Sequence, residues 1–472
     1  MSTNDDAIST LLGRTAQIAT DYLRTVDGRP VVPQADLAEL RRELGGPLPD
    51  GPTEQLAVVE ELARVAGPGL VASAGPRYFG FVIGGALPAA LAADWLTSAW
   101  DQNAAMYSMS PAAAVVEEVA AGWLLDIFGL PEGASVGFTT GATMASFTAL
   151  AAARHALLAG EGWDVERRGL FGAPEVPVVV GDEAHVTIHA ALQMLGLGRE
   201  RVVRVPVDGQ GRLRPDALRE ALGSLGRPAI VCAQAGNVNT GAFDLLAEIA
   251  ATVHAAGGWL HVDGAFGLWA GAVPSMRSLV AGVGDADSWT TDAHKWLNVP
   301  YDAGIVAVRD AAAHLAAMTL GAAYYVESTG AERDPFNWVP ESSRRARAFT
   351  IYAALRSLGR SGLTDLVERC CRLARRFAEQ LAAEPGIRIL NEVVLNQVLV
   401  RFETGDGDAA AGDQRTRHVV AAVQRDGTMW AGGTTWQGQA AMRISVSNWA
   451  TTDEDVDRST AAVLRCARSA VS

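Results

Sequence analysis

Lys295 is the residue of this sequence best suited to covalent chemistry. It lies between His294 and Trp296, in a chain whose basic residues are almost exclusively arginines. A lysine amine attacks a carbonyl carbon only in its neutral form, so a reactive lysine needs burial or nearby cations to lower its pKa. The aromatic neighbour favours such a site. The alternative is a solvated surface lysine, as most lysines are.

A carboxylate follows an apolar run earlier in the chain. Residues 259–262 are typical of a buried strand, and Asp263 comes directly after them. Ligands of open α/β sheets bind outside the carboxyl ends of the strands. There Asp263 could pair with a protonated ring nitrogen of a cofactor, and Ala265 is small enough for a flat ring to lie over it. Alternatively, Asp263 caps the next turn.

A histidine follows another apolar run. Residues 176–180 predict a strand, and His185 lies five residues beyond it. An imidazole at this strand end could stack on a cofactor ring or interact with a substrate carboxylate. A purely structural histidine is the alternative.

The run 139–143 (Thr-Thr-Gly-Ala-Thr) precedes a predicted helix. Backbone N–H groups at a helix start bind phosphate, so Gly141, Ala142 and Thr143 are candidate phosphate ligands. The run matches neither a Walker A loop nor a GxGxxG fingerprint, which argues against ATP and NAD.

These residues need a framework of strands and helices. β-Branched runs bounded by turn residues predict strands, and the stretches between them predict helices, which together indicate a mostly parallel sheet covered on both faces. The predicted strands are 176–180, 202–207, 229–233, 259–262 and 304–308, and the predicted helices are 144–159, 189–195, 215–222 and 245–256.

The flanking parts of the chain have a different texture. Residues 8–71 have helical periodicity with Pro/Gly breaks, and residues 324–343 are polar and predict a long loop. Helices 344–358 and 363–383, strands 387–390, 397–402 and 441–447, and a helix 418–426 are predicted to follow. We therefore expect three units: a helical arm (1–75), a large α/β domain (76–360) and a small α+β domain (361–472).

Composition narrows the class of protein. The 472 residues carry a net charge of −14, which argues against a general nucleic-acid or anionic-membrane surface. The four cysteines have no metal-ligand spacing, which predicts reduced thiols in a cytoplasmic protein. Residues 1–6 contain neither a basic nor an apolar run, so we do not expect a signal peptide, and no run is suited to a membrane span.

Three runs, taken in order, resemble the group II decarboxylases of fold type I that depend on pyridoxal 5'-phosphate (PLP), a family that includes aromatic-L-amino-acid and glutamate decarboxylases. In that family, Asp-x-Ala-His carries an imidazole that stacks on the cofactor, His-Val-Asp-x-Ala carries the partner of the pyridinium nitrogen, and His-Lys-Trp carries the Schiff-base lysine. The runs 182–185, 261–265 and 294–296 match these motifs. The likeness extends from about residue 75 to 447.

The resemblance implies a homodimer with a PLP-dependent transferase-like fold, whose N-terminal arms wrap the partner, and an amino acid as substrate. It implies catalytic roles for Lys295, His185 and Asp263. The implied cofactor site contains these three together with Ala265, Gly141, Ala142, Thr143, His294, Asn237 and Asp292, and no metal. The implied reaction is α-decarboxylation of an L-amino acid through a Schiff base on Lys295.

Several departures from the family pattern leave alternatives open. The family's loop tyrosine aligns with Pro335 or Phe336, and Tyr324 or Tyr325 could replace it. Asp292 stands where the family usually has Asn, and residues 237–239 replace a threonine-rich turn. Loss of the tyrosine could permit oxidation to an aldehyde or carbon–carbon cleavage, and a catalytically silent binding protein is a third interpretation.

The substrate pocket is less defined by the sequence. Four aromatic residues could line it or belong to the core, and Arg77 could bind a second carboxylate or face solvent. The four are Phe79, Phe81, Trp100 and Tyr107.

Overall fold

A seven-stranded sheet forms the centre of the computed structural model, which describes residues 3–319, 332–405 and 407–469. The strand order is β1-β7-β6-β5-β4-β2-β3, in which β3, β2, β4, β5 and β6 are parallel and β7 is antiparallel to both of its neighbours. The strands are β1 (Ser135–Thr139), β2 (Val178–Gly181), β3 (Val203–Val205), β4 (Ile230–Gln234), β5 (Trp259–Asp263), β6 (Ser288–Asp292) and β7 (Gly304–Val308). The predicted mostly parallel sheet is confirmed.

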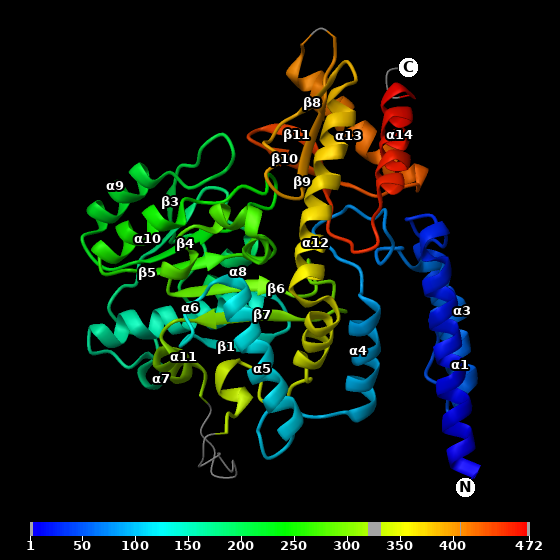
Figure 1. Ribbon diagram of the computed structural model, residues 1–472, viewed down its shortest axis with the longest axis horizontal. Helices are drawn as coiled ribbons and strands as arrows, with labels where there is room; N and C mark the ends of the chain where they lie inside the picture. Colours follow the sequence, from blue (N-terminus) through cyan, green and yellow to red (C-terminus); the bar gives the residue numbers. More distant parts are fainter. Residues whose placement is uncertain (1–2, 320–331, 406, 470–472) are drawn as a thin grey trace.

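Helices cover both faces of this sheet (Figure 1). Val179 and Val231 pack into one core, while their strand neighbours Val180 and Cys232 pack into the other. Both sides of each central strand are therefore apolar, which explains the continuous apolar runs. One face carries α6 (Ala142–Gly160), α8 (Val186–Met194) and α11 (Ala311–Met318), and the other carries α5 (Pro111–Phe128), α9 (Pro215–Leu225) and α10 (Leu246–Ala255). The short α7 spans Val165–Arg168.

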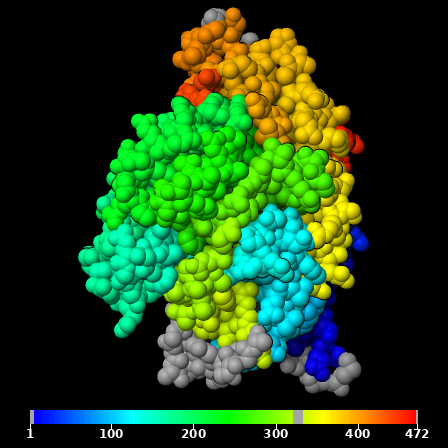
Figure 2. Space-filling model, turned by 60° about the vertical axis from the view of Figure 1, so that its left-hand side comes forward, coloured from blue at the N-terminus to red at the C-terminus, as the bar shows by residue number. Residues whose placement is uncertain are grey.

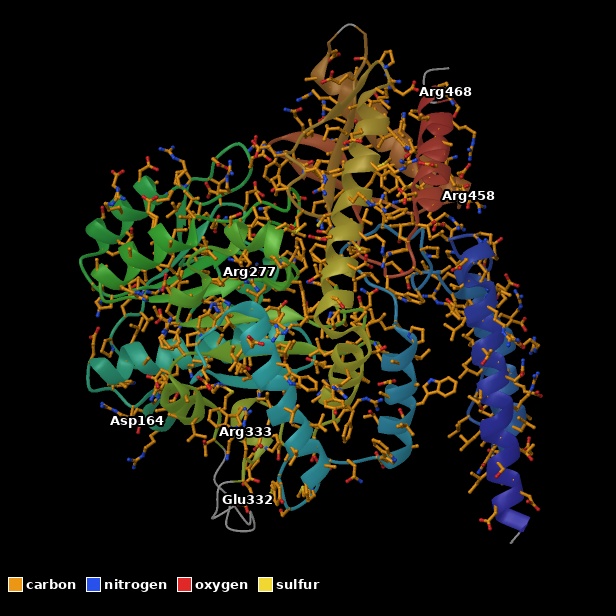
Figure 3. All side chains as sticks on the ribbon, viewed as in Figure 1. Asp164, Arg277, Glu332, Arg333, Arg458 and Arg468 are labelled. Carbon is orange, nitrogen blue, oxygen red and sulfur yellow. The ribbon has the colours of Figure 1, made fainter. Side chains whose placement is uncertain are left out.

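A second, four-stranded antiparallel sheet lies at the C-terminal end, in the order β10-β11-β9-β8. Its strands are β8 (Ile387–Ile389), β9 (Gln397–Phe402), β10 (Gly432–Trp436) and β11 (Gln439–Ser445), and it is accompanied by α13 (Ala409–Asp426) and α14 (Asp453–Ser469). Figure 2 shows this part, in orange, packed directly on the large sheet region, in green. Arg458 and Arg468 lie on α14 at the outside (Figure 3).

The helix α12 (Ala348–Ala382) connects the two sheets (Figure 1). Two helices were expected here, and this is confirmed: the range consists of two helical stretches that meet at Gly359, whose φ of 61° is left-handed. Glycine adopts that conformation without the steric cost of a side chain. α13 also begins nine residues before the predicted helix, because the run of alanines from Ala409 is helical as well.

The N-terminal arm is helical, as predicted. It contains α1 (Thr3–Thr25), α2 (Leu37–Leu44) and α3 (Gln55–Ala66), and α4 (Pro88–Trp100) follows at the edge of the main body. α1 and α3 lie side by side, set apart from the large sheet (Figure 1). The short 3-10 helices of the chain are Val26–Gly28, Gly67–Gly69, Gly267–Ala272, Pro274–Val280, Val283–Asp285 and Pro335–Trp338. The division at residues 75 and 360 stays a prediction.

Two further expectations concern cysteines and membranes. All four cysteines are buried, unpaired thiols, as predicted. Of the helices in the described part of the chain, none is long and apolar enough to cross a membrane.

Candidate active site

A cavity of about 320 Å³ opens at the carboxyl ends of β4 and β5. This volume lies in the range of small-molecule sites, and the position is the usual one for ligands of an open α/β sheet. Its polar lining residues are His185, Gln234, Asp263, Lys295, Tyr301 and Arg443. Four separate chain segments supply three potential cations, one carboxylate and one phenol to a single space.

Lys295 lies in the turn that follows β6 and lines this cavity. It is the single lysine of the whole sequence, although the chain has 39 basic residues of the Lys and Arg types. This count can be made from the sequence alone. Lys295 is therefore the only side-chain primary amine. Its Nζ lies 3.0 Å from Oδ2 of Asp292, the last residue of β6.

Asp292 connects Lys295 to the start of α6. Its Oδ1 accepts a hydrogen bond of 2.6 Å from the backbone N–H of Ala142, the first residue of that helix. The side chain is buried, and Nε2 of His294 lies 3.6 Å from the same oxygen. The predicted phosphate donor of Ala142 is thus bonded to a carboxylate of the protein, in a helix start that favours negative charge.

Asp263 and His185 both line the cavity, Asp263 from the end of β5 and His185 from the segment after β2. Asp263 ends β5, and its Oδ1 accepts from the N–H of Ala265 at 3.1 Å. His185 caps α8, and its Nδ1 lies 2.8 Å from the hydroxyl of Thr187. Burial, opposed by the carboxylate of Asp263, lowers the pKa of His185 below its ordinary value. The imidazole is therefore neutral near pH 7, which suits stacking on a ring.

Arg443 and Tyr301 were not predicted as site residues. Arg443 comes from β11 of the small sheet, and among the described residues it forms no ion pair; its one hydrogen bond is a 3.4 Å contact to the carbonyl of Val238. Burial lowers the pKa of Arg443. A half-buried arginine at a cavity, without an acidic partner, suits a ligand that carries the missing negative charge. No sequence motif pointed to Arg443, because β11 is distant from the motifs.

Tyr301 lies against His294, with ring centroids 4.4 Å apart. Burial, together with Asp292 and Tyr78, raises the pKa of Tyr301 to about 12. The phenol therefore keeps its proton at neutral pH.

The remaining predicted cofactor residues do not line the cavity itself. Gly141 precedes α6, and a Cβ there would come within 3.3 Å of His294. Asn237 accepts from the N–H groups of Asn239 and Thr240. Its buried Nδ2 has no hydrogen-bond partner among the described residues.

The predicted substrate residues separate into cavity and core. Phe81 lines the cavity, whereas Phe79 is buried against Phe377. Trp100 packs on Phe349, and the N–H of Tyr107 donates to Asp334. None of these last three lines the cavity.

Both interpretations of Arg77 were wrong. Its guanidinium is buried, pairs with Asp455 at 3.3 Å and donates to the carbonyl of Thr428 at 2.8 Å. The side chain therefore fastens the segment before α4 to the C-terminal part.

The loop that aligns with the family's tyrosine is partly described. Pro335 and Phe336 are buried, and Phe336 packs with Ala105 and Met106. Tyr324 and Tyr325 lie outside the described residues.

Comparison with known proteins gives a consistent result. Residues 38–403 match the pyridoxal-dependent decarboxylase conserved domain. L-2,4-diaminobutyrate decarboxylase of Rhizobium meliloti (strain 1021) is 31% identical over 432 residues, covering 89% of this chain and 84% of that protein. Phenylacetaldehyde synthase of Arabidopsis thaliana is 24% identical, covering 90% and 89%. A crystal structure of Oryza sativa TDC with PLP and tryptamine superposes with a TM-score of 0.92, at 23% identity and 99% coverage of both chains.

Proposed function

The chain belongs to the family of pyridoxal-dependent decarboxylases, and from this premise we propose that it removes the α-carboxyl group of an amino acid with an uncharged, mainly apolar side chain. The products are carbon dioxide and an amine. The observation that carries the proposal is the convergence of Lys295, Asp263 and Arg443 on one cavity. The cofactor of this family is PLP.

The donor set of the cavity fits PLP. The aldehyde requires an amine, and Lys295 is the only side chain that has one. The pyridine nitrogen requires an anion, for which Asp263 is available. Ala265 and His185 would flank the ring. PLP, when bound, supplies an electron sink for the electron pair left on the α-carbon.

The phosphate group would lie at the start of α6. We assign it to the backbone of Gly141, Ala142 and Thr143 together with His294, with Asp292 and Asn237 beside it. The side chain of Asp292 already accepts the hydrogen bond from the backbone N–H of Ala142, at the position that we assign to the phosphate. Binding of a phosphate dianion therefore requires the carboxylate to give up that N–H.

Arg443 would hold the substrate carboxylate. Arg443 is half-buried in the cavity wall, and within the described part of the chain its guanidinium has no acidic partner. A charge-assisted, bidentate pair with a carboxylate would satisfy it. An orientation fixed in this way determines which bond to the α-carbon breaks.

The rest of the cavity favours an apolar substrate side chain. Once Lys295, Asp263 and Arg443 are assigned, the described lining offers no further charged partner, because His185 is neutral near pH 7. A second carboxylate or a side-chain ammonium would stay unpaired, which is costly in a buried site. The apolar lining residues are Phe81, Val82, Ile83, Val238, Ala265 and Phe266.

Two groups could return a proton to the α-carbon after carbon dioxide leaves. One is the amine of Lys295 and the other is the phenol of Tyr301, which is protonated at neutral pH. Both line the same cavity, so either can donate without a residue from the loop.

Oxidative decarboxylation by O2 and water to an aldehyde, with release of carbon dioxide, ammonia and hydrogen peroxide, is a second candidate reaction. It is supported by Phe336, a residue without a transferable proton, in the part of the loop where the family has tyrosine. The similarity to phenylacetaldehyde synthase also supports it.

A homodimer is part of the proposal. Several large apolar side chains on α1, α3 and α4 are exposed in the single chain, which supports a partner that covers them. They include Ile8, Leu12, Leu62, Trp95, Leu96 and Trp100. Light scattering on the purified protein would give the mass of a dimer. The cytoplasmic location stays a prediction.

The reaction is tested with the PLP-loaded enzyme and each of the twenty amino acids. We expect carbon dioxide and an equimolar amine from at least one apolar or aromatic amino acid. Carbon dioxide with peroxide and aldehyde would favour the second reaction. Absence of carbon dioxide from all twenty would overturn the proposal.

A further inference from the structure

We propose that Trp430 is a positioning residue for substrate recognition, which holds the ring of Phe81 at the wall of the active-site cavity. Phe81 lines the cavity, whereas Trp430 does not. Trp430 lies between α13 and β10, so a segment of the small C-terminal part would tune the substrate preference of a site on the large sheet. The inference rests on the proposed function and adds to it a residue that acts through another.

The indole of Trp430 is stacked in parallel on two other aromatic rings, those of Tyr78 and Phe81. The indole of Trp430 lies parallel to the ring of Tyr78, with centroids 5.1 Å apart and an interplanar angle of 8°. On Phe81 the centroid distance is 5.6 Å and the angle 18°. Parallel aromatic rings at such distances attract each other beyond the effect of area burial. The indole of Trp430 is thus in parallel contact both with a buried tyrosine and with the cavity residue.

Phe81 has a backbone conformation that needs external support. Its φ is 54°, in the left-handed region that bulky residues rarely adopt, and 57% of its surface is exposed. Burial in a core therefore does not explain why the conformation persists. Strained residues persist where surrounding contacts fix them. The indole of Trp430 is the aromatic contact that the structure gives this ring.

Backbone contacts fix the indole relative to the Phe81 segment. The N–H of Phe79 donates to the carbonyl of Trp430 at 2.8 Å, and the N–H of Trp430 donates to the carbonyl of Arg77 at 3.2 Å. Gly80 completes the fit, because a Cβ at this position would lie 2.1 Å from Cζ3 of Trp430. Glycine at residue 80 is therefore required for the indole to lie flat on the chain.

The consequence concerns the substrate side chain. With one face of the Phe81 ring covered by the indole, the ring has a fixed position at the cavity, and a flat apolar side chain can stack on it without first ordering it. Without Trp430, Phe81 would leave the left-handed region and the cavity would lose this wall. Binding should weaken, while the chemistry at Lys295 should continue.

The test uses the PLP-loaded enzyme and its best amino-acid substrate. Trp430→Leu removes the stack and keeps an apolar side chain, Trp430→Phe keeps a ring, and Trp163→Leu is a matched control. Trp163 is also half-buried, and its neighbour Asp164 lies at the edge of the molecule remote from the small sheet (Figure 3). We expect Trp430→Leu to raise KM about three- to tenfold, with kcat within about twofold and bound PLP per chain unchanged. The KM of Trp430→Phe should lie close to that of the wild type, because a ring at residue 430 is kept.

Gly80→Ala is an independent variant that displaces the indole and should raise KM in the same way. A crystal structure of Trp430→Leu should show φ of Phe81 outside the left-handed region. Unchanged KM in both Trp430→Leu and Gly80→Ala would overturn the positioning role. A rise in KM accompanied by a fall in both kcat and bound PLP would overturn it as well. If the wild type acts on no amino acid, the proposed function fails, while the conformation of Phe81 in the variant still decides the structural claim.

Discussion

The amine of Lys295 and the backbone N–H of Ala142 are bound by the two oxygens of one carboxylate, that of Asp292, at 3.0 Å and 2.6 Å. The group expected to bind the aldehyde of PLP and the helix start expected to bind its phosphate are therefore joined by a single buried anion. This geometry makes Asp292 a sensitive position for cofactor affinity.

We expect Asp292→Asn to strengthen PLP binding about tenfold, because the negative charge beside the phosphate is removed. Titration of the cofactor-free protein with PLP, followed by absorbance, gives Kd. Asp216→Asn, on the exposed end of α9, is the control and should leave Kd unchanged. Weaker binding in Asp292→Asn would instead mean that the charge on Asp292 is needed to hold Lys295.

Labelling should occur at one lysine. Because Lys295 is the only lysine, borohydride reduction of the PLP-loaded enzyme should attach the cofactor to a single internal peptide. Lys295→Arg should abolish this labelling and lower kcat at least about a thousandfold, since arginine keeps the charge but cannot react with the aldehyde. Mass spectrometry locates the label. Full activity in Lys295→Arg would contradict the assignment.

Arg443 should discriminate substrate from product. Charge-assisted hydrogen bonds contribute about 1.5–3 kcal/mol, so Arg443→Gln should raise the substrate KM about 10- to 100-fold. The amine product lacks the carboxylate, so its inhibition constant should change less than about threefold. Arg204→Gln, on the exposed part of β3, is the matched control. An equal loss for substrate and product would show that Arg443 does not bind the carboxylate.

Tyr301 should influence which product forms. Its phenol is protonated at neutral pH, because the ordinary pKa of tyrosine is about 10 and that of Tyr301 is raised further. If Tyr301 protonates the α-carbon, Tyr301→Phe should lower the ratio of amine to peroxide about tenfold or more, since oxygen then competes for the carbanion. Coupled assays measure both products in one reaction. A constant ratio would point to Lys295 as the proton donor.

Folding stability should fall as the solution is acidified. Burial lowers the pKa of His261 and of His314 to about 3 in each case, so both are neutral in the folded protein, whereas the unfolded chain takes up protons below pH 6.5. Each histidine then costs about 1.4 kcal/mol of stability per pH unit below 6.5. Asp244 acts in the opposite direction below pH 6, because burial raises its pKa to about 6 and its protonated form favours the folded state.

Two histidines outweigh one carboxylate, so the net loss between pH 6.5 and 5 should be about 2 kcal/mol. Urea unfolding of the cofactor-free protein at several pH values measures it. His314→Asn should be less stable than the wild type at pH 7.5, since Ser135 and the carbonyl of Trp338 lose a partner, but should have a shallower dependence on pH. A stability independent of pH in the wild type would contradict this account.

The sequence by itself determined the class of fold and the nature of the cofactor. Continuous apolar runs alternating with helical stretches predicted a parallel sheet, because a strand that is buried on both faces has apolar residues at successive positions. Asp263 and His185 could be singled out because each comes shortly after a predicted strand, and strand ends meet at one edge, while Lys295 was singled out by its neighbours His294 and Trp296. The sequence also shows that Lys295 is the single lysine among 472 residues.

Only the tertiary structure decided which distant residues complete the cavity. Arg443 and Trp430 belong to the small C-terminal part, and no local pattern connects them with Lys295 or Phe81. Arg77 was misjudged for the same reason, because its partner Asp455 lies 378 residues away in the chain. Such contacts depend on how two packed units meet, and this is set by the shapes of both surfaces rather than by the periodicity of either segment.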